Sequence, residues 1–150
     1  MRLRYGDVFS LSVFYVTMNT QSLHILVVDD DHPYGALLRK ALTGRGHSVV
    51  ICDSAEKTFP RLQKEQFDIV LLDYKMEGTS GINVLQWMYG KKMDVPVILI
   101  TGYGSEEIYE EAYKWGASEY FVKGEMDSIR LPVMVEQAYN KHLARKKRLK

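Results

Sequence analysis

The sequence predicts an α/β fold built on one doubly wound, five-stranded parallel sheet. From residue 23 onward, short aliphatic runs alternate with longer segments in which apolar residues recur every three or four positions. The short runs are typical of strands covered on both faces, and the longer segments of amphipathic helices. The chain has 150 residues, of which 46% are hydrophobic and 26% charged, a balance that suits a single domain. We therefore expect strands and helices to alternate, with right-handed crossovers.

The first elements follow from these two patterns. Residues 23–28 form an aliphatic run too short for a helix, and residues 48–52 form another. Between them, residues 34–42 place apolar side chains on one stripe of a helix, which Gly44 and Gly46 end. We expect a strand, a helix and a second strand.

A second helix and a third strand come next. Asp53 and Glu56 have the spacing of a capping box, which predicts a helix that Pro60 shortens or kinks. The apolar run at residues 67–72 predicts the third strand.

The second half of the chain repeats the alternation. We expect a helix at 82–89, a strand at 95–100, a helix at 105–115, a strand at 119–122 and a last helix from about 132 to 142. Ser105 has the hydroxyl of an N-cap, and Pro132 suits a first helical position.

The first 22 residues are expected to form an N-terminal extension that is disordered or loosely docked. Arg2 and Arg4 precede an apolar stretch at 8–16, which has the outline of a short signal peptide. That stretch is about half of the ~20 residues that span a bilayer, and no small-residue cleavage site follows it. A secretory signal and a start assigned upstream of Met18 remain as alternatives.

Charge and cysteine content exclude several classes of protein. The 20 basic and 19 acidic side chains give a net charge of +1, which argues against attraction of the whole surface to nucleic acid or anionic lipid. Cys52 is the single cysteine, so no internal disulfide and no cysteine-based zinc site can form. We expect a cytoplasmic protein with neither a nucleic acid nor a membrane as partner.

Polar residues collect where the predicted strands end. They are Asp29, Asp30 and Asp31 after the first strand, Asp73 after the third, Thr101 after the fourth and Lys123 after the fifth. Ligands of such sheets bind outside the carboxyl ends of the strands. Clustered carboxylates raise one another's pKa and require a compensating cation, and oxygen ligands favour Mg²⁺, which is commonly shared with a phosphoryl group. Lys123 and Thr101 can then serve phosphoryl oxygens.

Four of these strand ends carry a specific resemblance. The segments are Ile25-Leu26-Val27-Val28-Asp29-Asp30-Asp31, Leu71-Leu72-Asp73-Tyr74-Lys75-Met76, Ile98-Leu99-Ile100-Thr101-Gly102 and Gly116-Ala117-Ser118-Glu119-Tyr120-Phe121-Val122-Lys123. Together they resemble the receiver domain of two-component response regulators over residues 23–145. The resemblance implies a flavodoxin-like (βα)5 fold and a phosphorelay signalling module rather than an enzyme.

The resemblance also assigns a role to each residue of the site. Asp73 would accept a phosphoryl group from a phosphohistidine on a sensor histidine kinase or phosphotransfer protein. Asp29 and Asp30 match the acidic pair that holds Mg²⁺, together with Asp73 and the backbone carbonyl of Lys75. Asp31 would lie beside the site without being required.

A switch is implied as well. Phosphorylation would draw Thr101 and Lys123 inward, and Tyr120 would turn into the space that Thr101 leaves. That movement would change the face formed by 105–115, 119–122 and the last helix, where a downstream protein would dock. Tyr103, Tyr109 and Tyr113 lie near this face. Homodimerisation is left open.

Two positions depart from the family pattern. Glu77 and Gly124 stand where prolines are usual, and both changes loosen the backbone locally. The placement of Lys123 is therefore less constrained than in the family. We further expect the bulky side chains of Lys75 and Tyr103 to slow attack of water on the acyl phosphate.

The last residues of the given sequence are rich in lysine and arginine. Residues 146–150 are expected to form a basic tail, most simply the solvated end of a helix. As alternatives, the tail contacts nucleic acid or acidic lipid, or leads into further sequence of a larger kinase or regulator.

Asp29 and Asp31 also resemble the D-x-D of haloacid-dehalogenase-type phosphatases, with Asp29 as nucleophile. That interpretation leaves Asp73 unused. A phosphorylation-inactive interaction module is the third alternative.

Overall fold

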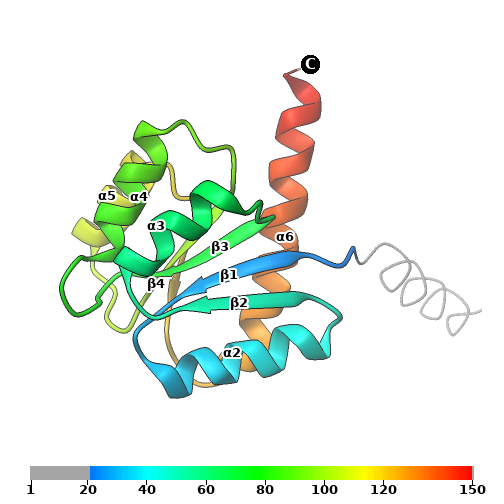
Figure 1. The fold of residues 1–150 in the computed structure, drawn as a ribbon. Helices are drawn as coiled ribbons and strands as arrows, with labels where there is room; N and C mark the ends of the chain where they lie inside the picture. The colour runs from blue at the N-terminus through cyan, green and yellow to red at the C-terminus, as the bar shows by residue number, and fades with distance from the viewer. Residues whose placement is uncertain (1–20, 150) are drawn as a thin grey trace, which may run out of the picture.

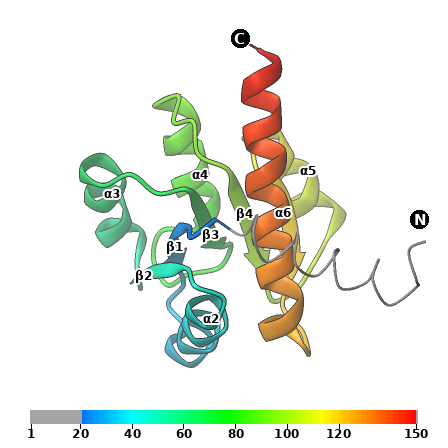
Figure 2. The same cartoon turned by 90° about the vertical axis from the view of Figure 1, so that its right-hand side faces the viewer.

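The computed structural model describes residues 21–149, in which five strands alternate with five helices (Figures 1 and 2). The elements are β1 (His24–Val28), α2 (His32–Gly44), β2 (Ser48–Cys52), α3 (Ala55–Lys64), β3 (Ile69–Asp73), α4 (Gly81–Gly90), β4 (Val97–Thr101), α5 (Glu106–Lys114), β5 (Glu119–Val122) and α6 (Asp127–Arg148). The predicted doubly wound α/β fold is confirmed. The expectation for the N-terminal extension falls almost entirely outside the described residues.

The sheet has the strand order β2-β1-β3-β4-β5, and all neighbouring strands are parallel. The chain moves outward from β1 to β2 and then returns past β1 to β3. The order therefore reverses between β1 and β3, and a crevice opens at their carboxyl ends. This is where the predicted site residues lie.

Successive residues of β1 pack on opposite faces of the sheet. Leu26 and Val28 belong to a cluster that includes buried residues of α3, α4 and α5, whereas Ile25 and Val27 belong to one that includes α2 and α6. Both faces are thus covered, and every residue of β3 and β4 is buried. This burial explains the unbroken aliphatic runs in the sequence.

Two strands end later than the sequence predicts. The third covers Ile69–Asp73 rather than 67–72, and the fourth covers Val97–Thr101 rather than 95–100. Asp73 and Thr101 are therefore the last residues of strands, fixed by the hydrogen-bond ladder of the sheet.

The predicted cap of the second helix is wrong. Ser54, not Asp53, is the N-cap of α3, and its hydroxyl accepts a hydrogen bond from Lys57 N at 3.2 Å. The Asp53 carboxylate instead pairs with the Lys57 ammonium at 2.8 Å. Pro60 lies inside the helix, which continues to Lys64. Packing of the apolar stripe outweighs the hydrogen bond that proline removes.

The predicted start of the last helix is also wrong. Helix α6 begins at Asp127, and Pro132 lies inside it. Met126 takes a left-handed conformation with φ of 67°, which turns the chain into the helix earlier than the proline signal suggests. The helix continues to Arg148, so three residues of the expected basic tail are helical, and its end extends past the sheet (Figure 1).

Within residues 21–149, no helix combines the length and the apolar character that crossing a bilayer requires.

Candidate functional site

The strand ends bring three carboxylates together. Asp29 directly follows β1, where its amide donates a hydrogen bond to Cys52 O at 3.0 Å, and Asp73 ends the neighbouring strand β3. One oxygen from each of Asp29, Asp30 and Asp73 lies within 4.8 Å of the others. Asp29 and Asp73 are only 3% and 4% exposed. This is the cluster that the sequence predicts.

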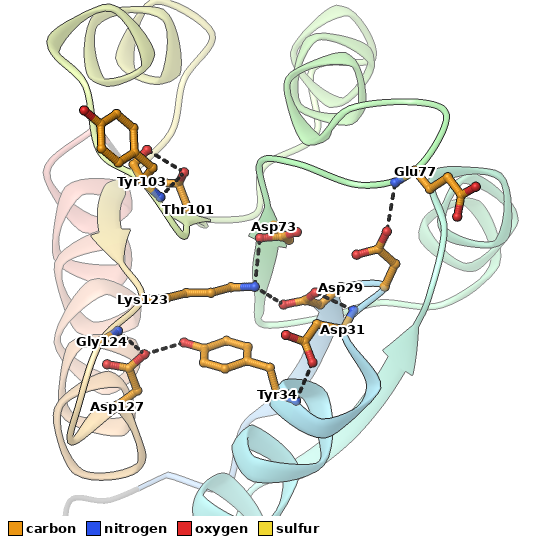
Figure 3. Close-up of polar contacts among 11 residues, drawn as sticks. Asp29, Asp31, Tyr34, Asp73, Glu77, Thr101, Tyr103, Lys123, Gly124 and Asp127 are labelled. Carbon is orange, nitrogen blue, oxygen red and sulfur yellow. Dashed lines mark hydrogen bonds and ion pairs between the residues drawn. The ribbon is translucent and has the colours of Figure 1, made fainter.

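Lys123 reaches into the same cluster from the loop after β5 (Figure 3). Its ammonium lies 3.0 Å from Asp29 Oδ2 and 3.2 Å from Asp73 Oδ1. The backbone amide of Lys123 donates to Thr101 O at 2.7 Å, which ties the start of this loop to the end of β4. A single amine therefore joins the two buried acids.

Burial and mutual repulsion shift the pKa values of this cluster. Burial raises the pKa of Asp73 from its usual value near 3.8 to about 6, with the Asp29 charge adding to the shift and Lys123 opposing it. Burial also raises the pKa of Asp29. Burial by itself lowers the pKa of Lys123, but its ion pairs with both carboxylates outweigh this effect and raise it. With a pKa of about 6, Asp73 is largely anionic at neutral pH, and the crowding of carboxylates around it favours a further cation beside Lys123.

Asp30 holds the loop that follows β3. Its Oδ2 accepts a hydrogen bond from Glu77 N at 2.8 Å. Asp30, Asp73, Lys75 and Tyr103 are among the residues that line a cavity of about 540 Å³ at this end of the sheet. Asp31 serves as the N-cap of α2, as its side chain accepts from Tyr34 N at 3.0 Å.

The donor set fits a hard divalent cation. Asp30 and Asp73, from two adjacent strand ends, line one cavity, and Tyr74 and Lys75 of the loop after Asp73 line it as well. Within residues 21–149, aspartates are the whole of this cluster, with neither a thiol nor an imidazole group among its side chains. Such oxygen-only sites suit Mg²⁺, which keeps several of its waters.

Thr101 and Tyr120 lie on the side of the site formed by β4 and β5. Thr101 Oγ1 donates to Tyr103 O at 2.9 Å, so its hydroxyl is engaged with the loop (Figure 3). The ring of Tyr120 contacts that of Tyr109 edge to face at 5.7 Å between centroids. The buried Tyr120 hydroxyl has no hydrogen-bond partner among the described residues.

Three residues of this region are not predicted from the sequence. Tyr34 is expected only on the apolar stripe of a helix, yet its hydroxyl donates to Asp127 Oδ2 at 2.7 Å beside Lys123. Asp127 gives no signal because it lies in a short polar segment that is typical of a loop. Gly81 lies against the backbone of Asp73, and only knowledge of the three-dimensional path reveals this contact.

Comparison of this sequence with known proteins identifies similar transcriptional regulatory proteins. Transcriptional regulatory protein ZraR of Escherichia coli K12 is 33% identical over 121 residues, which are 81% of this chain and 27% of ZraR. Transcriptional regulatory protein FixJ of Bradyrhizobium diazoefficiens is 33% identical over 115 residues, 77% of this chain and 56% of FixJ. The chain thus spans about a quarter of ZraR.

Comparison with solved structures also identifies response regulator proteins. A CheY-like receiver domain protein from Methanospirillum hungatei JF-1 matches with a TM-score of 0.77 at 23% identity, covering 83% of this chain and 99% of that one. Response regulator TrrA of Thermotoga maritima, solved in complex with Mg²⁺-BeF, has a TM-score of 0.69 at 30% identity, covering 77% and 97%. The family model described as response regulator receiver domain matches residues 25–136. This chain therefore belongs to the receiver domain family of two-component response regulators.

Proposed function

We propose that Asp73 accepts a phosphoryl group from a phosphohistidine of a sensor histidine kinase or phosphotransfer protein, in a Mg²⁺-dependent reaction. The observation that carries this proposal is the buried Asp73 carboxylate, held 3.2 Å from the Lys123 ammonium beside Asp29 and Asp30. We further propose that the chain acts in the cytoplasm as a signalling module and not as an enzyme.

The chemistry follows from the charges of the site. An Asp73 oxygen attacks phosphorus in line, and the P–O bond forms as the P–N bond to the donor imidazole breaks; the ring, already protonated on its other nitrogen, leaves as neutral imidazole. Mg²⁺ held by Asp29, Asp30, Asp73 and the Lys75 carbonyl would offset the repulsion between the carboxylate and the phosphoryl group. Lys123 adds a positive charge 3.2 Å from Asp73 Oδ1, and the Thr101 hydroxyl, once released from Tyr103 O, would donate to a phosphoryl oxygen.

The contacts of the two buried acids favour Asp73 over Asp29 as the nucleophile. Asp29 Oδ1 accepts from Asp31 N at 2.8 Å and Asp29 Oδ2 pairs with Lys123, so both of its oxygens are engaged. Asp73 pairs with Lys123 through Oδ1. The haloacid-dehalogenase interpretation, which needs Asp29 to attack, is not favoured by the family match either.

The proposed output face consists of α5, β5 and the first turns of α6. Large apolar side chains are exposed there, namely Tyr103, Tyr109, Tyr113, Val122, Met126, Ile129 and Val133. The contact of Tyr120 with Tyr109 supports a role for Tyr120 in transmitting a change at Thr101 to this face. A downstream protein or a second copy of the chain would bind it.

The names of the curated relatives bear on the expected partners. ZraR and FixJ are named as transcriptional regulatory proteins, which conflicts with the expectation that no nucleic acid is involved. We therefore leave nucleic acid open as a partner of the full regulator to which such a domain belongs.

Intact and peptide mass spectrometry after incubation with acetyl phosphate and Mg²⁺ tests the proposal. A phosphoryl label on Asp73, lost in Asp73→Asn, is the expected result. Label on Asp29 or sustained phosphatase turnover would instead support the rival enzyme, and an unlabelled protein would support an inactive interaction module. The NMR signal of the Tyr120 ring should shift when beryllium fluoride and Mg²⁺ are added, if Tyr120 takes part in the switch.

A further inference from the structure

The aromatic ring of Tyr34 supports the Lys123 ammonium from a third side. The Lys123 Nζ lies 4.4 Å from the centroid of that ring, while Asp29 and Asp73 hold it at 3.0 and 3.2 Å. A cation at this distance is attracted by the negative face of the ring, most strongly where water is excluded. The Lys123 side chain is only 20% exposed, so the contact is largely protected from solvent.

Tyr34 is itself fixed at its hydroxyl (Figure 3). The hydroxyl donates to Asp127 Oδ2 at 2.7 Å, and the amide of Gly124 donates to the same oxygen at 3.0 Å. Asp127 is 2% exposed, and it is the first residue of α6, where the helix dipole favours a negative charge. One buried carboxylate thus ties the first turn of α2 to the residue that follows Lys123.

The hydrogen bond from Gly124 to Asp127 compensates for the flexibility of the backbone at this glycine. Glycine leaves the backbone after Lys123 with more conformational freedom than any other residue would, so β5 alone holds the lysine loosely. Unlike a proline, Gly124 has an N–H that can donate to Asp127. The hydrogen bond restrains the loop at the position where the covalent chain does not.

We propose that Tyr34 is a positioning residue for Lys123, acting through its ring on the ammonium and through Asp127 on the Lys123–Gly124 backbone. Tyr34 touches neither Asp73 nor the phosphoryl group in this role. It keeps the ammonium between Asp29 and Asp73, so that the positive charge is already in place when phosphoryl transfer begins. This inference rests on the proposed function of Asp73 for its effect on rate, but not for its effect on the mobility of Lys123.

A double-mutant cycle on the full chain tests the role. The rate of Asp73 phosphorylation by acetyl phosphate at saturating Mg²⁺ is followed by intact mass for wild type, Tyr34→Leu, Lys123→Gln and the double variant. Tyr34→Leu is expected to slow the reaction by about 3- to 30-fold, the range of a partly buried cation–π contact. In the Lys123→Gln background the same substitution should change the rate by less than about twofold. Equal effects in both backgrounds would overturn the proposal.

Two further variants separate positioning from folding. Tyr34→Phe keeps the ring and loses only the hydroxyl, so it should recover part of the rate lost in Tyr34→Leu. Tyr139→Leu, which removes a half-buried tyrosine that packs against the apolar cluster between α6 and the sheet, should leave the rate unchanged. Failure of Tyr34→Phe to exceed Tyr34→Leu would argue against the ring as the supporting group.

A measurement without phosphorylation keeps the proposal separate from the proposed function. The order parameter of the Lys123 ε-methylene, measured by NMR relaxation, should fall in Tyr34→Leu and stay close to wild type in Tyr139→Leu. If wild type takes no label on Asp73, the proposed function fails, and this order parameter still decides whether Tyr34 holds Lys123. An unchanged order parameter in Tyr34→Leu would refute the positioning role.

Discussion

Gly81 begins α4 directly against the carbonyl of Asp73. A Cβ at position 81 would lie 2.0 Å from the Asp73 carbonyl oxygen and 2.9 Å from its carbonyl carbon. The Gly81 amide donates to Tyr74 O at 2.8 Å, so the loop after β3 closes back onto the strand end. The position of the proposed phosphoacceptor therefore depends on a residue that lacks a side chain.

We expect Gly81→Ala to destabilise the fold by about 1–3 kcal/mol, because backbone must move to admit the methyl group. The same movement should slow phosphorylation of Asp73. Urea denaturation and the acetyl phosphate assay measure the two effects. Gly90→Ala, at the other end of α4 with nothing within 4 Å of its Cβ, is the matched control and should cost nothing. Equal stability of the two variants would show that the close approach is not a constraint.

Asp73→Asn should stabilise the metal-free protein at pH 7 by about 1–3 kcal/mol. Burial raises the pKa of Asp73 to about 6 in the folded state, so the folded protein prefers the protonated form more than the unfolded chain does. The contribution of Asp73 to the free energy of unfolding is therefore greatest below about pH 4, and it is lost as the pH rises through about 6. Asparagine carries no charge at any pH. The gain over wild type, measured from urea midpoints in EDTA, should vanish below about pH 4, and a gain independent of pH would contradict this account.

Mg²⁺ affinity should fall as the pH drops below about 6, by up to tenfold per pH unit. Protons and the metal compete for the Asp73 carboxylate, whose pKa burial raises to about 6. Calorimetric titration of Mg²⁺ at pH 5.0, 6.0 and 7.5 checks the slope. An affinity that stays constant across this range would mean that Asp73 does not ligate the ion.

The exposed side chains of Lys75 and Tyr103 should slow hydrolysis of the acyl phosphate. Both line the cavity that contains Asp73, and Tyr103 is 80% exposed. Removing them in Lys75→Ala, Tyr103→Ala should open the path of water and speed the loss of label by about 3- to 10-fold. The decay of phosphorylated protein after removal of acetyl phosphate gives the rate. Loss from wild type as fast as from the double variant would exclude this shielding.

The fold and the acidic cluster could be predicted because both depend on local pattern. Aliphatic runs covered on two faces leave a strong signal, and a parallel sheet brings its carboxyl ends to one edge, so Asp29, Asp73 and Lys123 could be placed together.

Local signals failed where tertiary contacts compete with them. Pro132 suggested a helix start, but the left-handed turn at Met126 and burial of Asp127 set the true one. Tyr34 and Asp127 are 93 positions apart in sequence, and no pattern in either segment reveals that they meet. Contacts of this kind depend on the packing of α2 against α6.

The amine bridging two acids also sets the ionic balance of the pocket. Three carboxylates and one ammonium carry a net formal charge of −2, the complement of one divalent ion. Electroneutrality alone therefore cannot distinguish Mg²⁺ from Mn²⁺ or Ca²⁺, so discrimination among them must come from coordination number and ionic size. A six-coordinate ion such as Mn²⁺ should replace Mg²⁺ readily, whereas Ca²⁺, which seeks more ligands, should fit poorly.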